Sequence, residues 1–241
     1  MKFNIAKIGG VKSELVFEDR LETEFVKALA EKEIFAGKAE EVYFSMNDKF
    51  EVILLIGLGK EENIEFDMLR KTFFKVAEVL LKNKVAEVEL NIPKLNNLCN
   101  YKLAEAIAEG MLQATYKFDK FKSEKKETPE LTVNYNPIPG KEHRAEKGID
   151  EAEKLIESIF LTRDLINQPA NVIYPETLAD IAKERLEAKG VKVTVYGRKE
   201  IEELKRVGEL DFAFLKECEQ HMQLTVQLVK DWLVRYKFKT W

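Results

Sequence analysis

The sequence predicts an α/β protein, because short apolar segments alternate with longer segments of helical spacing over about the first 135 residues. One apolar run, residues 52–56, is almost continuous, as expected of a strand buried on both faces of a sheet. Residues 64–83 repeat apolar side chains at the spacing of an amphipathic helix. The composition, 45% hydrophobic and 34% charged, is that of a chain able to form a packed core.

The expected strands of this first part are bounded by turn residues. Gly9 and Gly10 separate the first two strands, Asn47 and Asp48 join the third and fourth as a hairpin, and Pro93 ends the fifth. In chain order, the expected strands are residues 2–8, 14–17, 41–46, 50–56, 85–92 and 131–135, and the expected helices are residues 23–34, 64–83 and 103–116.

A domain boundary is expected at residues 136–140, where two prolines and a glycine follow the last strand. The elements expected beyond it are a long helix at 143–165, a helix beginning near Pro175 and ended by Gly190, and a strand at 191–196. The sequence therefore predicts one domain at 1–140 and the start of a second unit after it.

Charge and cysteine content exclude several classes of protein. The 39 basic and 43 acidic residues give a net charge of −4, which argues against a dedicated nucleic-acid binder. Cys99 and Cys218 lie far apart, so reduced thiols are expected instead of a disulfide framework. Residues 1–8 have no signal-type apolar core, and no uncharged apolar run approaches the ~20 residues that span a bilayer. These features predict a soluble, cytoplasmic protein.

Gly57-Leu58-Gly59-Lys60 directly follows the buried strand and is the first candidate for chemistry. A glycine-rich turn in this place can present backbone N–H groups to a phosphate. The dinucleotide-binding and P-loop patterns are incomplete, since no third glycine and no Lys-Ser or Lys-Thr pair follow at the required spacing. The sequence favours a structural turn over a phosphate site.

Candidate metal ligands and nucleophiles are sparse. Cys218 and His221 are three residues apart, but two ligands make a poor metal site, and His143 has no partner at ligand spacing. No Gly-x-Ser-x-Gly nucleophile pattern occurs. The remaining candidates are interpreted as solvated charges or as a buried or inert thiol: Glu61-Glu62, Glu202-Glu203 and Cys99. No catalytic, metal-binding or cofactor-binding residue is therefore predicted.

Residues 230–241 combine basic and aromatic side chains. Such a segment can engage a membrane surface or a nucleic acid, and a chain end outside the native fold has a similar composition. The sequence favours the second interpretation.

Three segments together resemble the leucyl aminopeptidase family, the cytosol aminopeptidases of peptidase family M17. They are LLIGLGK at 54–60, AEGML at 108–112 continuing to YKFDKFKS at 116–123, and TRDLINQPANVIYPETLA at 162–179. The third segment is the most specific, and the spacing between the segments also fits. The resemblance extends from residue 1 to about residue 204.

This resemblance implies a macro-domain-like mixed sheet flanked by helices at 1–140, a linker helix at 141–165 and the start of the catalytic domain at 162–204. The family forms hexamers and releases N-terminal residues from peptides with two divalent metal ions, zinc or manganese. The metals activate a water molecule and stabilise the developing oxyanion.

Residues 205–241 depart from the family pattern. The family's metal-binding and catalytic motifs lie further downstream and do not occur in this sequence. We therefore expect a truncated α/β unit after the linker helix, with no peptidase activity of its own and peptides as substrates only if a catalytic domain completes it. Two alternatives remain: a nucleotide-binding macro-like module, and an oligomerisation partner of a full-length aminopeptidase. DNA binding ranks below both, because the net charge is acidic.

Overall fold

The computed structural model describes residues 1–47, 51–95, 98–124, 129–197, 199–201 and 203. The chain divides into two compact units, residues 1–167 and 168–241, and each is described by itself. Glu202 and the segment 205–241, with Cys218, His221 and the basic-aromatic residues 230–241, lie outside the described residues.

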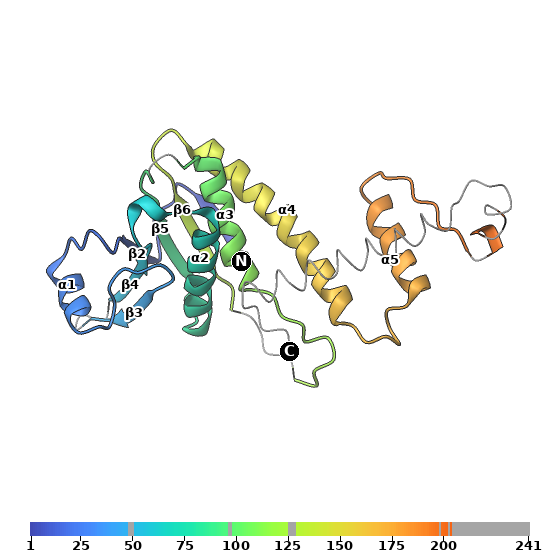
Figure 1. The fold of residues 1–241 in the computed structure, drawn as a ribbon, viewed down its shortest axis with the longest axis horizontal. Helices are drawn as coiled ribbons and strands as arrows, with labels where there is room; N and C mark the ends of the chain where they lie inside the picture. Colours follow the sequence, from blue (N-terminus) through green and yellow to red (C-terminus); the bar gives the residue numbers. More distant parts are fainter. Residues whose placement is uncertain (48–50, 96–97, 125–128, 198, 202, 204–241) are drawn as a thin grey trace. The chain divides into compact units, whose positions relative to one another are not determined.

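The first unit is built on a six-stranded mixed sheet with the strand order β1-β6-β5-β2-β4-β3 (Figure 1). The strands are β1 (Lys2–Ile5), β2 (Val11–Val16), β3 (Val42–Met46), β4 (Val52–Gly57), β5 (Glu87–Asn91) and β6 (Thr132–Asn136). Neighbouring strands are parallel except β3, which pairs antiparallel with β4. The predicted α/β class and the predicted hairpin of β3 and β4 are confirmed.

The helices of this unit begin and end within three residues of their predicted positions. They are α1 (Glu24–Glu31), α2 (Phe66–Lys82), α3 (Asn100–Gln113) and α4 (Glu142–Asn167), with a 3₁₀ turn at Glu61–Asn63. Thr23 caps α1, because its hydroxyl accepts a hydrogen bond from the backbone N–H of Val26 at 3.2 Å.

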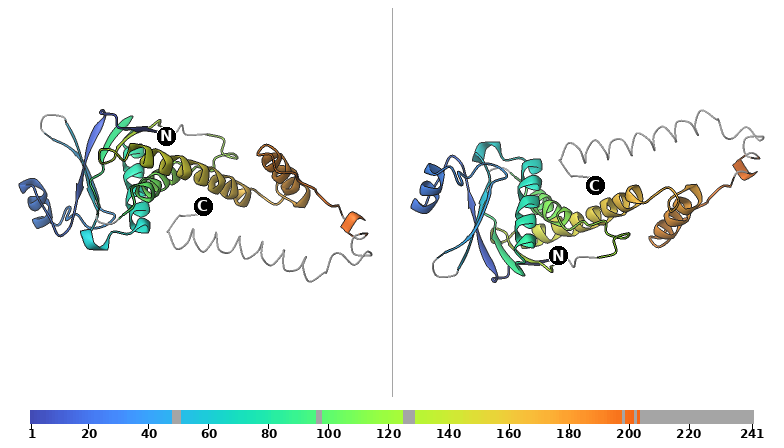
Figure 2. Two further views of the ribbon diagram at one scale, coloured as in Figure 1. Left: turned by 90° about the horizontal axis from the view of Figure 1, so that it is seen from above. Right: turned by 90° about the horizontal axis from the view of Figure 1, so that it is seen from below.

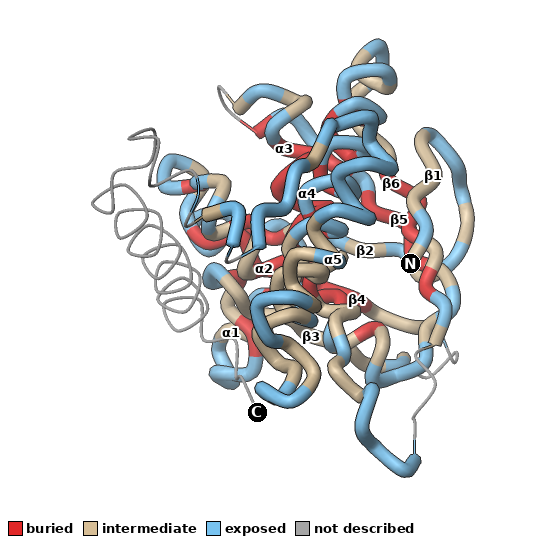
Figure 3. Tube along the Cα trace, turned by 90° about the vertical axis from the view of Figure 1, so that its right-hand side faces the viewer, coloured by how far each residue is buried: buried red, intermediate tan, exposed pale blue. Residues whose placement is uncertain are grey.

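Two hydrophobic clusters cover opposite faces of the sheet, with α1 on one side and α2, α3 and α4 on the other (Figure 2). Leu54 and Ile56 of β4 pack in the larger cluster with α2, α3 and α4, whereas Leu55 packs with α1. The alternation follows from the two-residue period of a strand. In Figure 3 the buried segments lie where α2 and α3 meet the strands, and α1 is largely exposed.

The first two strands are parallel but are not neighbours, so residues 6–10 must cross β6 and β5. Phe3 of β1 pairs with Val133 of β6, and Val133 pairs with Val88 of β5. Val88 in turn pairs with Val11 of β2. The predicted turn glycines lie in this crossing. Gly10 has a φ of +82°, and a Cβ there would lie 2.4 Å from the carbonyl oxygen of Glu87.

Side chains on β5 and β6 hold the crossing segment in place. The side-chain amide of Asn134 donates to the carbonyl of Gly9, and the backbone N–H of Gly9 donates to Glu89, both at 3.0 Å. Asn134 is completely buried and Glu89 nearly so. These polar groups therefore replace the apolar contacts that would otherwise position a connection between parallel strands.

The first half of α4 packs against α3 and belongs to the first unit. Its buried residues are Ala145, Gly148, Ile149, Ala152 and Ile156. A Cβ at Gly148 would lie 2.2 Å from the carbonyl oxygen of Tyr101, so this glycine allows the two helices to approach closely.

The second unit contains α5 (Pro175–Glu187), which begins at a proline as predicted and has no buried residue. The strand expected at 191–196 is wrong: these residues have no strand structure, and Val191 and Val195 are about half exposed. Alternating valines indicate only that a segment is able to pair with another strand. A strand forms when a neighbouring strand supplies the hydrogen bonds. No helix in the described part of the chain is both long and apolar enough to cross a membrane.

Candidate functional site

The turn at Gly57–Lys60 is held by the backbone of its own unit. The N–H groups donate as follows: Gly57 to the carbonyl of Glu41 at 2.9 Å, Leu58 to that of Val16 at 2.9 Å, and Gly59 to that of Gly37 at 2.8 Å. Gly57 and Gly59 are required because a Cβ at Gly57 would lie 2.2 Å from the carbonyl oxygen of Lys38, and Gly59 has a φ of +70°. Three amides that could bind a phosphate already donate to backbone carbonyls, which supports the prediction of a structural turn.

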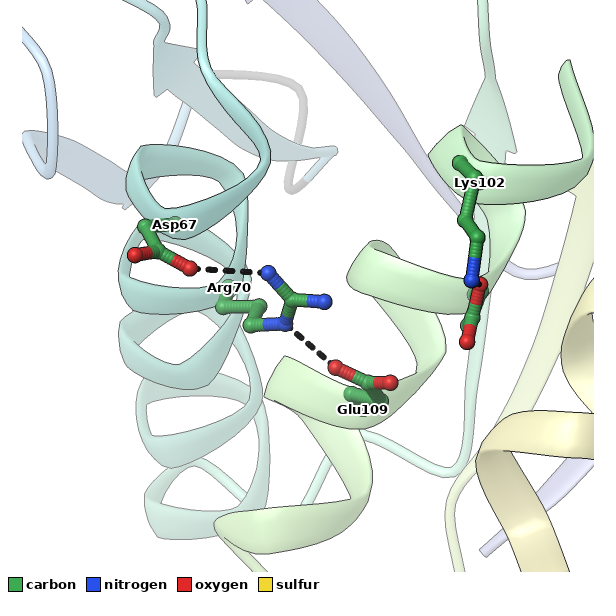
Figure 4. Close-up of polar contacts among 5 residues, drawn as sticks. Asp67, Arg70, Lys102 and Glu109 are labelled. Carbon is green, nitrogen blue, oxygen red and sulfur yellow. Dashed lines mark hydrogen bonds and ion pairs between the residues drawn. The ribbon is translucent and has the colours of Figure 1, made fainter. Parts of the chain in front are cut away.

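Two acidic side chains on α3 are neutralised by basic neighbours (Figure 4). Arg70 of α2 lies between Asp67 and Glu109 and donates a hydrogen bond to each, at 2.8 Å to Asp67. The Glu109 side chain is only 5% exposed. Lys102 forms an ion pair with Glu105 at 2.6 Å. A buried carboxylate held by a guanidinium in this way acts as a structural ion pair.

The sequence analysis missed the role of Glu109, although this residue lies in one of the segments that resemble the family. The signal was the presence of Glu105 and Glu109, four residues apart, in a helix that is otherwise mostly apolar. A charge at a buried helix position requires a partner, but the sequence does not reveal that Arg70 supplies it.

A second cluster joins two of the family-like segments. Tyr116 follows α3, and its hydroxyl donates to Asp164 and accepts from the side-chain amide of Asn167, both at 3.0 Å. The guanidinium of Arg163 lies over the Tyr116 ring, 3.7 Å from the ring centroid, and the Phe160 ring centroid is 5.1 Å away. Burial is the main cause that raises the pKa of Tyr116, so the phenol keeps its proton and remains a donor at neutral pH.

The described residues do not fit a metal pair. They contain no group of three or more His, Cys, Asp or Glu side chains placed to hold an ion. His143 has only Glu146 beside it, at 3.7 Å, and both side chains are exposed. Glu62 is exposed, and Glu61 pairs with Arg20 at 3.4 Å, in agreement with their interpretation as surface charges.

Cys99 was expected to be a buried or inert thiol; it is exposed, so it is not buried, and an inert thiol stays a prediction. It precedes the first residue of α3, where backbone N–H groups point towards the chain that enters the helix. Hydrogen bonds from the N–H groups of Lys102 and Tyr101, with a smaller effect from the charge of Arg144, lower the pKa of Cys99.

The first unit is similar in sequence to known proteins. Residues 10–125 match the family model described as the N-terminal domain of the cytosol aminopeptidase family. This part of the chain is therefore similar to the N-terminal domain of cytosol aminopeptidases. A probable cytosol aminopeptidase of Treponema denticola is 70% identical over 213 residues, which are 88% of this chain and 45% of that protein. The similarity to this cytosol aminopeptidase therefore extends beyond residues 10–125.

Other cytosol aminopeptidases are more distant. A probable cytosol aminopeptidase of Clostridium tetani is 37% identical over 209 residues, covering 85% of this chain and 44% of the relative. The chain thus spans about half the length of the curated relatives it matches.

Solved structures share the fold of this chain. A mutant of tomato leucine aminopeptidase matches with a TM-score of 0.69 and 18% identity, over 85% of this chain and 46% of that one. The bottromycin maturation enzyme BotP matches with a TM-score of 0.65 and 20% identity, over 82% of this chain and 41% of that one. A structure of BotP in complex with Mn matches with the same TM-score and identity.

Proposed function

We propose that this chain supplies the N-terminal, non-catalytic part of a leucyl aminopeptidase, together with the helix that leads towards the catalytic part. The observation that carries the proposal is the 70% identity to a probable cytosol aminopeptidase over 213 residues. A domain of this kind has its own core, as the cluster of β4, β5, β6, α2, α3 and α4 demonstrates for residues 1–167.

The chemistry in this proposal belongs to residues beyond the aligned region. In leucyl aminopeptidases of this type, two divalent metal ions, zinc or manganese, would activate the attacking water and stabilise the oxyanion. The described residues contain no group of three or more His, Cys, Asp or Glu side chains that could hold such an ion. In this proposal their role is to fold, to assemble and to carry the catalytic part. We place the protein in the cytoplasm, because the relatives are named cytosol aminopeptidases.

Hydrolysis of leucine-p-nitroanilide tests the proposal. The purified 241-residue chain is expected to give no turnover with added Mn²⁺ or Zn²⁺, and the full-length Treponema denticola relative serves as the positive control under the same conditions. Metal-dependent turnover by this chain, abolished by a chelator, would overturn the non-catalytic assignment.

A second role, assembly with a full-length aminopeptidase or with copies of this chain, is favoured by one observation. Five large apolar side chains of the second unit are 44–54% exposed: Tyr174, Leu186, Val191, Val195 and Tyr196. Exposed apolar side chains gathered in one short segment favour association. Size-exclusion chromatography of the chain, alone and mixed with the full-length relative, is expected to show a mass above the monomer, and a strictly monomeric elution in both cases would remove this role.

A further inference from the structure

The C-terminal half of α4 is held differently from its first half. Buried residues occur only as far as Ile156, and each residue from 157 to 167 is exposed or half-buried. Core packing therefore does not explain why the helix continues to Asn167, the last residue of the first unit.

Four residues in this half share one helix face. Phe160, Arg163, Asp164 and Asn167 have the spacing i, i+3, i+4 and i+7, which places them along a single stripe. All four contact the side chain of Tyr116: one through a ring contact, one through its guanidinium and two through hydrogen bonds.

We infer that Tyr116 is a positioning residue that fixes the C-terminal half of α4 against the end of α3. Its hydroxyl donates one hydrogen bond and accepts another, and the two partner residues lie one helical turn apart. The ring packs against Phe160 and lies under the guanidinium of Arg163. The point at which the chain leaves the first unit thus depends on one side chain in the segment that follows α3. This inference concerns residues 116–167 alone and does not depend on the aminopeptidase proposal.

Hydrogen–deuterium exchange of the full chain, followed by mass spectrometry, tests the inference. Tyr116→Phe keeps the ring and the Arg163 contact but removes both hydrogen bonds, so the amides of residues 157–167 should exchange about tenfold faster. Residues 142–156 should be unchanged, because the core holds them. Tyr101→Phe, at the start of α3 beside Lys102, is the matched control and should leave residues 157–167 unaffected.

A double-mutant cycle separates positioning from general packing. If the Tyr116 hydroxyl acts through Asn167, the double variant will accelerate exchange at residues 157–167 by less than the sum of the effects of Tyr116→Phe and Asn167→Ala on the free energy of exchange. The inference is overturned if exchange at 157–167 is unchanged in Tyr116→Phe, if the acceleration extends equally over 142–156, or if the two substitutions are additive.

Discussion

Arg70 of α2 contacts two consecutive residues of α3. Its guanidinium binds the buried carboxylate of Glu109, and its carbonyl oxygen would lie 2.3 Å from a Cβ at Gly110. The side chain and the backbone of one residue therefore define the point where the two helices meet. A small residue is required for the close approach and an acidic residue for the charge, which explains why the two occur side by side in the sequence.

The buried ion pair is expected to contribute to stability. Glu109→Ala leaves Arg70 without its buried partner, while Asp67 and partial exposure of the guanidinium relieve some of the cost. We expect a loss of about 2 kcal/mol in the free energy of unfolding, measured by urea denaturation followed by circular dichroism. Lys27→Ala, which removes the exposed pair with Glu24, is the control and should change little. A loss below about 0.5 kcal/mol in Glu109→Ala would contradict the expectation.

The close approach of α2 and α3 predicts a penalty for any side chain at Gly110. Gly110→Ala should destabilise the fold by about 2 kcal/mol, since the new methyl group clashes with the backbone carbonyl of Arg70, which is fixed within α2. Gly140→Ala is the matched control: nothing lies within 4 Å of a Cβ there. Its φ of +79° alone should cost about 1 kcal/mol. A thermal midpoint of Gly110→Ala equal to or above that of Gly140→Ala would contradict the expected penalty for the close approach of the helices.

Acid should loosen the crossing between β1 and β2. Hydrogen bonds from the Asn91 side chain and the Gly9 N–H lower the pKa of Glu89 from its ordinary value of 4.5. A carboxylate with a lowered folded pKa stabilises the protein fully above that ordinary value, and the contribution is lost as the pH falls through the folded pKa. In urea titrations at a series of pH values, Glu89→Gln should therefore lose less stability on acidification than the parent chain. Parallel pH profiles for the two proteins would refute this role.

The hydrogen bonds of the glycine turn at residues 57–60 lead us to expect no nucleotide binding there. Because the N–H groups of Gly57, Leu58 and Gly59 already donate to backbone carbonyls, ADP-ribose should give no saturable heat in calorimetry. Saturable binding that is weakened by Lys60→Ala, a substitution at an exposed position next to the turn, would restore the nucleotide-binding alternative.

Local patterns in the sequence determined the order and type of nearly all the elements. The apolar spacing of residues 64–83 and the continuous apolar run before Gly57 each depend on a few neighbouring residues, and the structure agrees with both. The glycine turn was also expected from local residues, and its N–H groups at Gly57, Leu58 and Gly59 donate to backbone carbonyls. The family-like segments also predicted the resemblance to cytosol aminopeptidases, which the family model matching residues 10–125 confirms. Motif residues and their spacing can be recognised in a sequence without any knowledge of contacts.

Only the tertiary structure decided which distant residues meet. The pairing of β1 with β6 joins residues about 130 positions apart, as the bond between Asn4 and Asn134 illustrates, and no local signal specifies it. The partners of Glu109 and Tyr116 are decided in the same way, by helices that come together only when the core forms. At residues 191–196 the sequence has a strand pattern, but the structure has no strand. Pairing needs a neighbour as well as a pattern, and a sequence supplies only the pattern.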